Sequence, residues 1–310
     1  MMGILRHAIA AIVLVTLAGC ITGEVPPERL PRFVKTSATP HVALVLGSGG
    51  PRGFAHIGVI KVLEEAGIKP DLIVGSSVGS VVGALYASGM NATRLEKLAH
   101  EINVLQFFEW SLVTHTPGSG KPVQEYVSER VHDKMIEELP IAFAAAATRM
   151  SDHQLVLFNR GDTGLAVRAS SASAPDFGTV RIGDDTYMDS DELSPVPIRS
   201  ARTLGAQVVI AVDVSAFASD TPPGVPQEWI DKDARRAKQV AAEAPAADVM
   251  LHPNIGYYAG HDEKYRRRVI DAAERYTREK LPAIRLALQR AGVAATQAAS
   301  ARTPAGETSR

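Results

Sequence analysis

The feature that most constrains the fold is one continuous stretch, residues 72–89, with the sequence LIVGSSVGSVVGALYASG. Three apolar residues suited to a buried strand lead into Gly-Ser-Ser-Val-Gly, and small residues follow at helical spacing. Glycines at positions 75 and 79 would let a strand and a helix approach closely around the central residue, Ser77. The stretch therefore predicts a strand, a tight turn and a helix, which is the arrangement of a nucleophile elbow.

An elbow makes Ser77 a candidate nucleophile. The turn would present its hydroxyl at the end of a strand. The first turn of the following helix would supply free N–H groups and a positive dipole end where an oxyanion forms. A Gly- and Ser-rich turn without a catalytic role is the alternative, because so short a pattern also arises by chance.

The N-terminal residues predict export and anchoring. Residues 1–19 have the form of a lipoprotein signal peptide, in which Arg6 precedes an apolar run too short to span a bilayer. The run ends in Leu-Ala-Gly-Cys, which resembles the bacterial lipobox and implies that Cys20 is lipidated, with residues 20–40 as a tether. The resemblance to bacterial lipoproteins also implies, because Ile21 rather than Asp follows the cysteine, that the protein lies at the outer membrane of the cell envelope and faces the periplasm. An ordinary signal peptide is the alternative.

Composition excludes several other classes of protein. About 45% of the 310 residues are apolar, enough for a substantial core, and the net charge of −1 gives no electrostatic support for a nucleic-acid partner. Cys20 is the only cysteine, so a disulfide framework is excluded. No His, Asp or Glu cluster has metal-ligand spacing, and we expect neither a metal nor a cofactor. Residues 41–291 are the expected folded domain, and residues 292–310 a disordered tail.

A second glycine-rich segment precedes the elbow. The apolar run 42–46 predicts a strand, the sequence GSGGPRG breaks it, and residues 54–66 show helical periodicity. The segment lacks the Lys-Ser/Thr pair of a phosphate loop and the glycine spacing of a dinucleotide loop. It fits an oxyanion loop, in which free backbone N–H groups of the turn face a developing negative charge and Arg52 adds a cation nearby. The order strand, loop, helix, strand, elbow, helix predicts an α/β domain with a mainly parallel sheet.

These two segments, LVLGSGGPRGFAHIGVIKVLEEAGI and the elbow, resemble the patatin-like phospholipase family over about residues 42–215. The resemblance implies a three-layer α/β/α fold, with residues 216–291 as a helical extension. It also implies a hydrolase of lipid acyl esters, of the phospholipase A or lysophospholipase kind, that acts on membrane lipids without a cofactor. The functional residues that it implies are Ser77 and Asp189 as a catalytic dyad, with Gly49, Gly50 and Arg52 in the oxyanion loop.

The chain departs from the family pattern in three places. Ser48 stands where the oxyanion loop usually has a glycine, and Pro51 where a small residue is common. Asp189-Ser190-Asp191 replaces the family's Asp-Gly, so that a second carboxylate lies beside the expected base. That charge raises the pKa of one carboxyl group, which either suits Asp189 as a base or accompanies a misplaced dyad. A catalytically impaired lipid-binding or envelope-interaction lipoprotein is therefore a rival hypothesis.

A Ser-His-Asp triad is the other rival mechanism, because the chain has nine histidines. The chain order of an α/β-hydrolase triad is satisfied by His252 or His261, although neither has a distinguishing local pattern. His56 is expected to pack near the oxyanion loop.

The remaining periodicity predicts further elements. Residues 141–147, 154–158, 207–214 and 248–251 read as strands, and residues 231–243 and 263–288 as helices, the last interrupted or kinked at Pro282. The aromatic residues Phe107, Phe108 and Trp110 suit either core packing or an acyl-binding wall or lid.

Overall fold

The structure, a computed structural model, describes residues 25–36, 39, 41–107 and 117–293. The predicted signal peptide, Cys20, Phe108 and Trp110 lie outside the described residues, as does nearly all of the predicted tail. Within the described part, eight strands form one sheet in the order β5-β6-β3-β2-β1-β7-β8, and β4 pairs with β3. The strands are β1 Val42–Leu46, β2 Leu72–Ser76, β3 Ala142–Arg149, β4 Gln154–Phe158, β5 Val180–Ile182, β6 Asp185–Asp189, β7 Val208–Val212 and β8 Val249–Leu251.

The centre of the sheet is parallel and one end is antiparallel. Strands β3, β2, β1, β7 and β8 pair in parallel, whereas β4 and β6 run antiparallel to β3, and β5 runs antiparallel to β6. The four strands predicted from the later apolar runs correspond to β3, β4, β7 and β8. The expectation of a mainly parallel sheet is confirmed.

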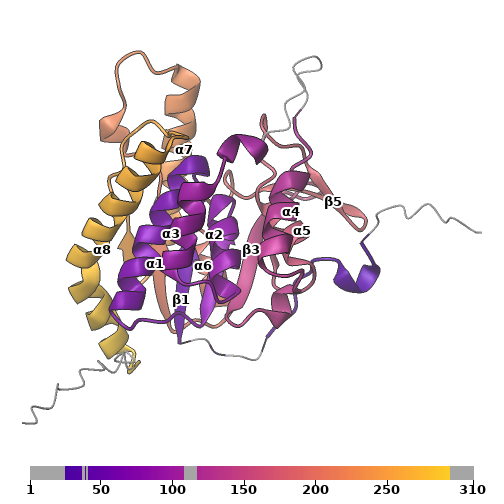
Figure 1. Cartoon of the computed structure of the whole chain (residues 1–310), viewed down its shortest axis with the longest axis horizontal. Coiled ribbons are helices and arrows are strands. Elements are labelled where there is room, and N and C mark those ends of the chain that lie inside the picture. Colours follow the sequence, from indigo (N-terminus) through magenta and orange to yellow (C-terminus); the bar gives the residue numbers. More distant parts are fainter. Residues whose placement is uncertain (1–24, 37–38, 40, 108–116, 294–310) are drawn as a thin grey trace, which may run out of the picture.

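Helices cover the sheet on both faces (Figure 1). In Figure 1, α8 lies beside α1 and α3 at one end of the molecule, and α4 and α5 lie at the other. The helix α8 runs through Pro282, where we expected an interruption or a kink, and its Ile284 and Leu288 side chains are buried beyond the proline. None of the helices in the described ranges is long and apolar enough to cross a bilayer. The helices are α1 Ala55–Glu65, α2 Val78–Ala87, α3 Ala92–Glu101, α4 Lys121–Arg130, α5 Thr163–Ser170, α6 Ile198–Thr203, α7 Gln227–Glu243 and α8 Glu263–Arg290.

The alternation of β1 shows why its sequence is continuously apolar. Val42, Leu44 and Leu46 belong to a core shared with α1, α2, α3 and α8. Ala43 and Val45 face the opposite side, in a core to which α6 contributes. Because neighbouring side chains of a strand point to opposite faces, a strand covered by helices on both sides has no polar position. The predicted three-layer α/β/α fold is therefore confirmed.

Two strands meet end to end beside β3. Ser76 at the end of β2 pairs with Ala146, and Asp189 at the end of β6 pairs with the next residue, Ala147. Because β4 occupies the other edge of β3 at these residues, β2 and β6 must share one edge and run toward each other. The carboxyl ends of β2 and β6 therefore come together at the middle of the sheet.

Candidate active site

Ser77 occupies the turn between β2 and α2 in a strained backbone conformation. Its φ of 54° and ψ of −126° lie outside the regions that L-residues normally adopt. The neighbouring glycines allow this turn, because a Cβ atom at Gly79 would lie 2.1 Å from the Leu46 carbonyl oxygen and one at Gly75 would lie 2.5 Å from the Ser80 Cα. The predicted strand, turn and helix are therefore present, with the backbone strain expected of an elbow.

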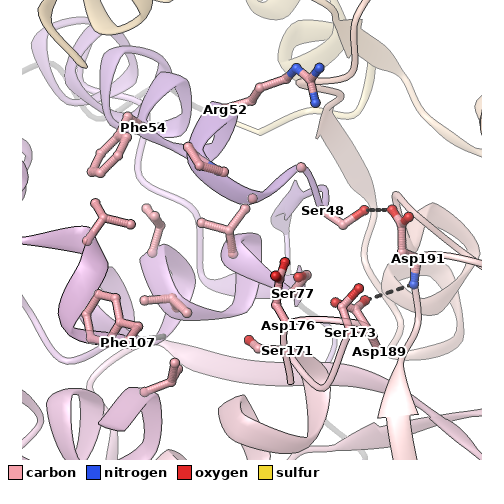
Figure 2. A pocket seen from close by; sticks show the side chains of 18 of the residues that line it. Ser48, Arg52, Phe54, Ser77, Phe107, Ser171, Ser173, Asp176, Asp189 and Asp191 are labelled. Carbon is pink, nitrogen blue, oxygen red and sulfur yellow. Dashed lines mark hydrogen bonds between the residues drawn. The ribbon is translucent and has the colours of Figure 1, made fainter. Parts of the chain in front are cut away.

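Asp189 lies at the end of β6 and is 3% exposed. Its carboxylate lies beside the Ser77 side chain, as Figure 2 shows, and accepts a 2.9 Å hydrogen bond from the N–H of Asp191. Burial, and then the charge of Asp191, raises the pKa of Asp189 to about 7, against the opposing effects of the Ser77 side chain, the Asp191 N–H and Arg236. A carboxyl group with such a pKa exchanges protons near neutral pH, as a general base must.

The glycine-rich loop lies between β1 and α1. Gly49 and Gly50 have φ values of 155° and 54°, and Gly49 with ψ of 12° is in a conformation open only to glycine. The N–H groups of Gly47 and Ser48 donate to carbonyl oxygens at 3.0 and 2.8 Å. Those of Gly49 and Gly50 have no partner among the described residues. Two backbone donors are thus available near Ser77, which is the requirement of an oxyanion site.

His56 supports this loop, as expected from the sequence. Burial lowers the pKa of His56 to about 4, so its ring is neutral, and Nε2 donates a 2.8 Å hydrogen bond to the Gly47 carbonyl oxygen. The loop is therefore tied to α1 through a side chain that stays uncharged at neutral pH.

The Arg52 guanidinium takes a different direction from the one that the loop pattern suggested. Arg52 lines the cavity, but its guanidinium donates to the Tyr257 carbonyl oxygen, and Figure 2 shows the side chain directed away from Ser77. In this structure Arg52 connects the glycine-rich loop to the segment before α8.

Two of the departures from the family pattern, Ser48 and Asp191, contact each other. The backbone φ of Ser48 is not positive, so a side chain at this position causes no backbone strain. Its hydroxyl donates to the Asp191 carboxylate, as the dashed line in Figure 2 shows. Arg236 of α7 binds both residues, and is 8% exposed. We did not identify Arg236 from the sequence; its only signal is its position four residues before buried Val240 on an otherwise largely exposed helix.

A cavity of about 390 Å³ opens onto Ser77 and Asp189. One part of its wall is polar and includes Ser48, Ser173, Asp176 and Lys232. The other part is apolar, and Figure 2 shows Phe54 and Phe107 within it, across the cavity from Ser77. The apolar wall comes from α1, α2, α3, α4 and two short 3-10 helices, η2 (Gly50–Phe54) and η3 (Val104–Phe107). It includes Phe54, Val81, Leu85, Leu95, Ala99, Ile102, Phe107 and Tyr126. An apolar chain fits this wall while a polar group meets the catalytic side chains.

The histidines considered for a triad lie elsewhere. His252 Nε2 is 3.0 Å from the Ser215 carbonyl oxygen and 3.8 Å from Asp213 Oδ2, and the Phe217 ring stacks on its imidazole. Nε2 thus faces both Ser215 and Asp213, whereas the histidine of a triad binds the nucleophilic serine through one ring nitrogen and the acid through the other. No histidine of the described part lines the cavity, and His261 is exposed. The triad residues are thus not brought together with Ser77.

Known proteins share these features. The profile of the patatin-like phospholipase family matches residues 44–202. An uncharacterized NTE family protein of Mycobacterium bovis is 34% identical over 212 residues, which cover 65% of this chain and 58% of that protein. The human patatin-like phospholipase domain-containing protein 6 is 34% identical over 184 residues, 56% of this chain and 13% of that protein. Lysophospholipase nte1 of Emericella nidulans is 32% identical over 191 residues, 59% of this chain and 12% of that protein.

The solved structure of VipD from Legionella pneumophila shares the fold, with a TM-score of 0.55 and 13% identity, over 84% of this chain and 71% of that one. The chain spans less than two thirds of the length of the curated relatives described above. The family profile nevertheless covers half of the chain, and residues 44–202 contain the elbow, the glycine-rich loop and Asp189. The chain belongs to the patatin-like phospholipase family.

Proposed function

We propose that this protein hydrolyses acyl esters of lipids, with Ser77 as the nucleophile and Asp189 as its general base. The observation that carries the proposal is the buried Asp189 carboxylate, which lies beside the Ser77 side chain (Figure 2) and borders a cavity with an apolar wall. Family membership supports the same assignment.

In the proposed reaction, Asp189 accepts the Ser77 hydroxyl proton while Oγ attacks the ester carbonyl carbon. The N–H groups of Gly49 and Gly50 stabilise the oxyanion. Asp189 then returns the proton to the departing alcohol, leaving an acyl-serine. A water molecule, deprotonated by Asp189, attacks the acyl-serine and releases the fatty acid, and the proton returns to Ser77.

The proposed substrates are phospholipids or lysophospholipids. The apolar wall suits an acyl chain, and the polar wall suits an ester with a polar head group. One relative, from Emericella nidulans, is named a lysophospholipase. This name supports a lysophospholipid as the first substrate to test.

We also propose that Cys20 is lipidated and holds the domain at the bacterial outer membrane, on the periplasmic side. The support is the lipobox-like sequence before Cys20. Growth of an expressing bacterium with an alkyne-tagged fatty acid should label the wild-type protein, and Cys20→Ser should remove the label and release the protein from the membrane fraction. An equally membrane-bound Cys20→Ser protein would contradict the anchor.

The catalytic proposal is tested by labelling the purified protein with a fluorophosphonate, which reacts with activated serines. We expect stoichiometric labelling of the wild type and its loss in Ser77→Ala and Asp189→Asn. Ser173→Ala is the matched control, because Ser173 also lines the cavity and should leave labelling intact.

The rival hypotheses are separate outcomes of that experiment. Loss of labelling in folded His252→Ala would favour a triad. A folded wild type that is not labelled but binds lysophospholipid would favour the lipid-binding protein.

A further inference from the structure

Arg236 is a buried arginine in a helix that otherwise faces solvent. It lies on α7, outside residues 44–202, which match the family profile. Its immediate neighbour Arg235 is exposed, whereas the side chain of Arg236 is 9% exposed. A guanidinium so removed from water must be compensated by nearby acceptors.

The acceptors come from the two loops that flank the proposed catalytic residues. Nη1 donates 2.7 Å to the Ser48 hydroxyl and also to the Asp191 carboxylate, while Nη2 donates 2.8 Å to the Ser48 carbonyl oxygen. The Ser48 hydroxyl donates in turn to Asp191, which closes a three-residue network. Asp213, at the end of β7, lies 3.6 Å from Nη2 and adds a second carboxylate.

This network lies beside the reacting groups on both sides. Ser48 precedes Gly49, whose N–H group is a proposed oxyanion donor. Asp191 donates its own N–H to Asp189 at 2.9 Å. The planar guanidinium therefore fixes the glycine-rich loop relative to the turn that holds the base, a fork geometry that lysine cannot reproduce.

The charge of Arg236 matters as well as its shape. Asp191 is the negative group that faces Asp189, and Arg236 is the positive group that opposes it. Lys232, which is largely exposed, lies 3.9 Å from Asp191. Asp213 and His56 are the other titratable groups near Arg236. Without Arg236, the carboxylates of buried Asp189 and half-buried Asp191 would keep their repulsion and lose their main counter-charge.

We propose that Arg236 is a positioning residue that holds Ser48 and Asp191 together, sets the glycine-rich loop against the Asp189 turn, and offsets the charge of Asp191 beside the base. On this proposal, Ser48 and Asp191 do not disrupt the family's site. They belong to one hydrogen-bond network, which Arg236 of α7 completes. The inference rests on the proposed function of Ser77 and Asp189.

The first test measures the second-order rate of fluorophosphonate labelling against pH for the full chain in detergent. Arg236→Met should lower the rate at pH 7 by about 10- to 100-fold through misplacement of the loops. It should also move the midpoint of the acidic limb upward by about one pH unit, because a positive charge near Asp189 is lost. Arg235→Met is the matched control and should change neither value.

Three further variants separate charge from shape. Asp191→Asn should move the midpoint downward, and Asp191→Asn/Arg236→Met should return it to within about 0.5 pH unit of the wild type. Arg236→Lys should keep the midpoint but not the rate, because it retains the charge and loses the fork. A folded Arg236→Met protein with an unchanged rate and midpoint would overturn the inference.

Hydrogen exchange gives a readout that does not depend on activity. We expect amides of residues 47–54 and 188–194 to exchange more than about tenfold faster in Arg236→Met, and Arg236→Lys to lie between it and the wild type. Unchanged exchange in both segments refutes the positioning role even if the wild type is not labelled. If the wild type is not labelled but Arg236→Met still exchanges faster than the wild type in both segments, the proposed catalysis is refuted and the positioning role stands.

Discussion

Ser76 and Ser190 share a hydrogen bond of 2.7 Å between their buried hydroxyl oxygens. Ser76 precedes Ser77 and Ser190 follows Asp189, so the bond joins the two strand ends that carry the proposed dyad. Ser190 occupies the position of the family's glycine without positive φ. The backbone at this position therefore does not require glycine, and the Ser190 hydroxyl is hydrogen-bonded to Ser76.

This pair can be tested by a double-mutant cycle. Ser76→Ala and Ser190→Ala should each lower the free energy of unfolding by about 1–3 kcal/mol, because each leaves a buried hydroxyl without its partner. The double variant should lose less than the sum of the two, by about 0.5–1.5 kcal/mol, in urea unfolding. Exact additivity would show that the hydroxyl pair contributes nothing.

The pKa of Asp189 predicts the pH dependence of labelling. Asp189 must be deprotonated to accept the Ser77 proton, and burial raises its pKa to about 7. The rate should therefore rise with pH and reach half its plateau near pH 7. A midpoint near pH 4, the ordinary range of an aspartate, would contradict Asp189 as a buried base.

The raised pKa of Asp189 also makes stability depend on pH. Whereas the labelling rate should rise with pH, the free energy of unfolding should fall. Between the ordinary aspartate pKa and about 7, the folded protein binds a proton that the unfolded chain does not, so stability falls as pH rises through this window. Asp189→Asn removes this loss and should raise the free energy of unfolding at pH 8 by more than about 1 kcal/mol, with a smaller gain at pH 4. Equal gains at both pH values would refute the titration.

Gly79→Ala should destabilise the elbow severely. The new methyl group would meet the Leu46 carbonyl oxygen at 2.1 Å, and neither backbone segment can move without disturbing β1 or α2. We expect a loss of at least about 2 kcal/mol in urea unfolding, as for other overpacked sites. Gly178→Ala is the control, because its methyl group would find no atom nearer than 3.7 Å, and it should cost less than about 1 kcal/mol.

Val81→Phe tests the acyl-chain assignment of the cavity. Val81 lies one turn after Ser77 on α2, and its partly exposed side chain lines the cavity. The larger ring should reduce hydrolysis of long-chain p-nitrophenyl esters relative to the acetate by more than about tenfold. Thr93→Phe, at an exposed position of α3, should leave that ratio unchanged. An unchanged ratio in Val81→Phe would place the acyl chain elsewhere.

Local sequence was enough to predict much of the fold. The apolar runs that predicted strands are present as β1, β2 and β7, and the glycines around Ser77 lie in the predicted turn before α2. These signals depend only on residues that are close in the sequence. The helix α8 is instructive, because local rules predicted an interruption or a kink at Pro282, whereas the helix continues through the proline and Ile284 and Leu288 are buried beyond it.

The sequence by itself determined the strand, turn and helix around Ser77, the glycine-rich loop and the candidate Asp189, because strand length, glycine conformation and helical periodicity are properties of neighbouring residues. Only the tertiary structure decided that β2 and β6 meet on one edge of β3, which brings Asp189 to Ser77. It also decided that Arg236 joins Ser48 to Asp191. These contacts depend on strand pairing and helix packing between segments that are far apart in the sequence. A short sequence pattern does not indicate which distant residue will be the contact partner.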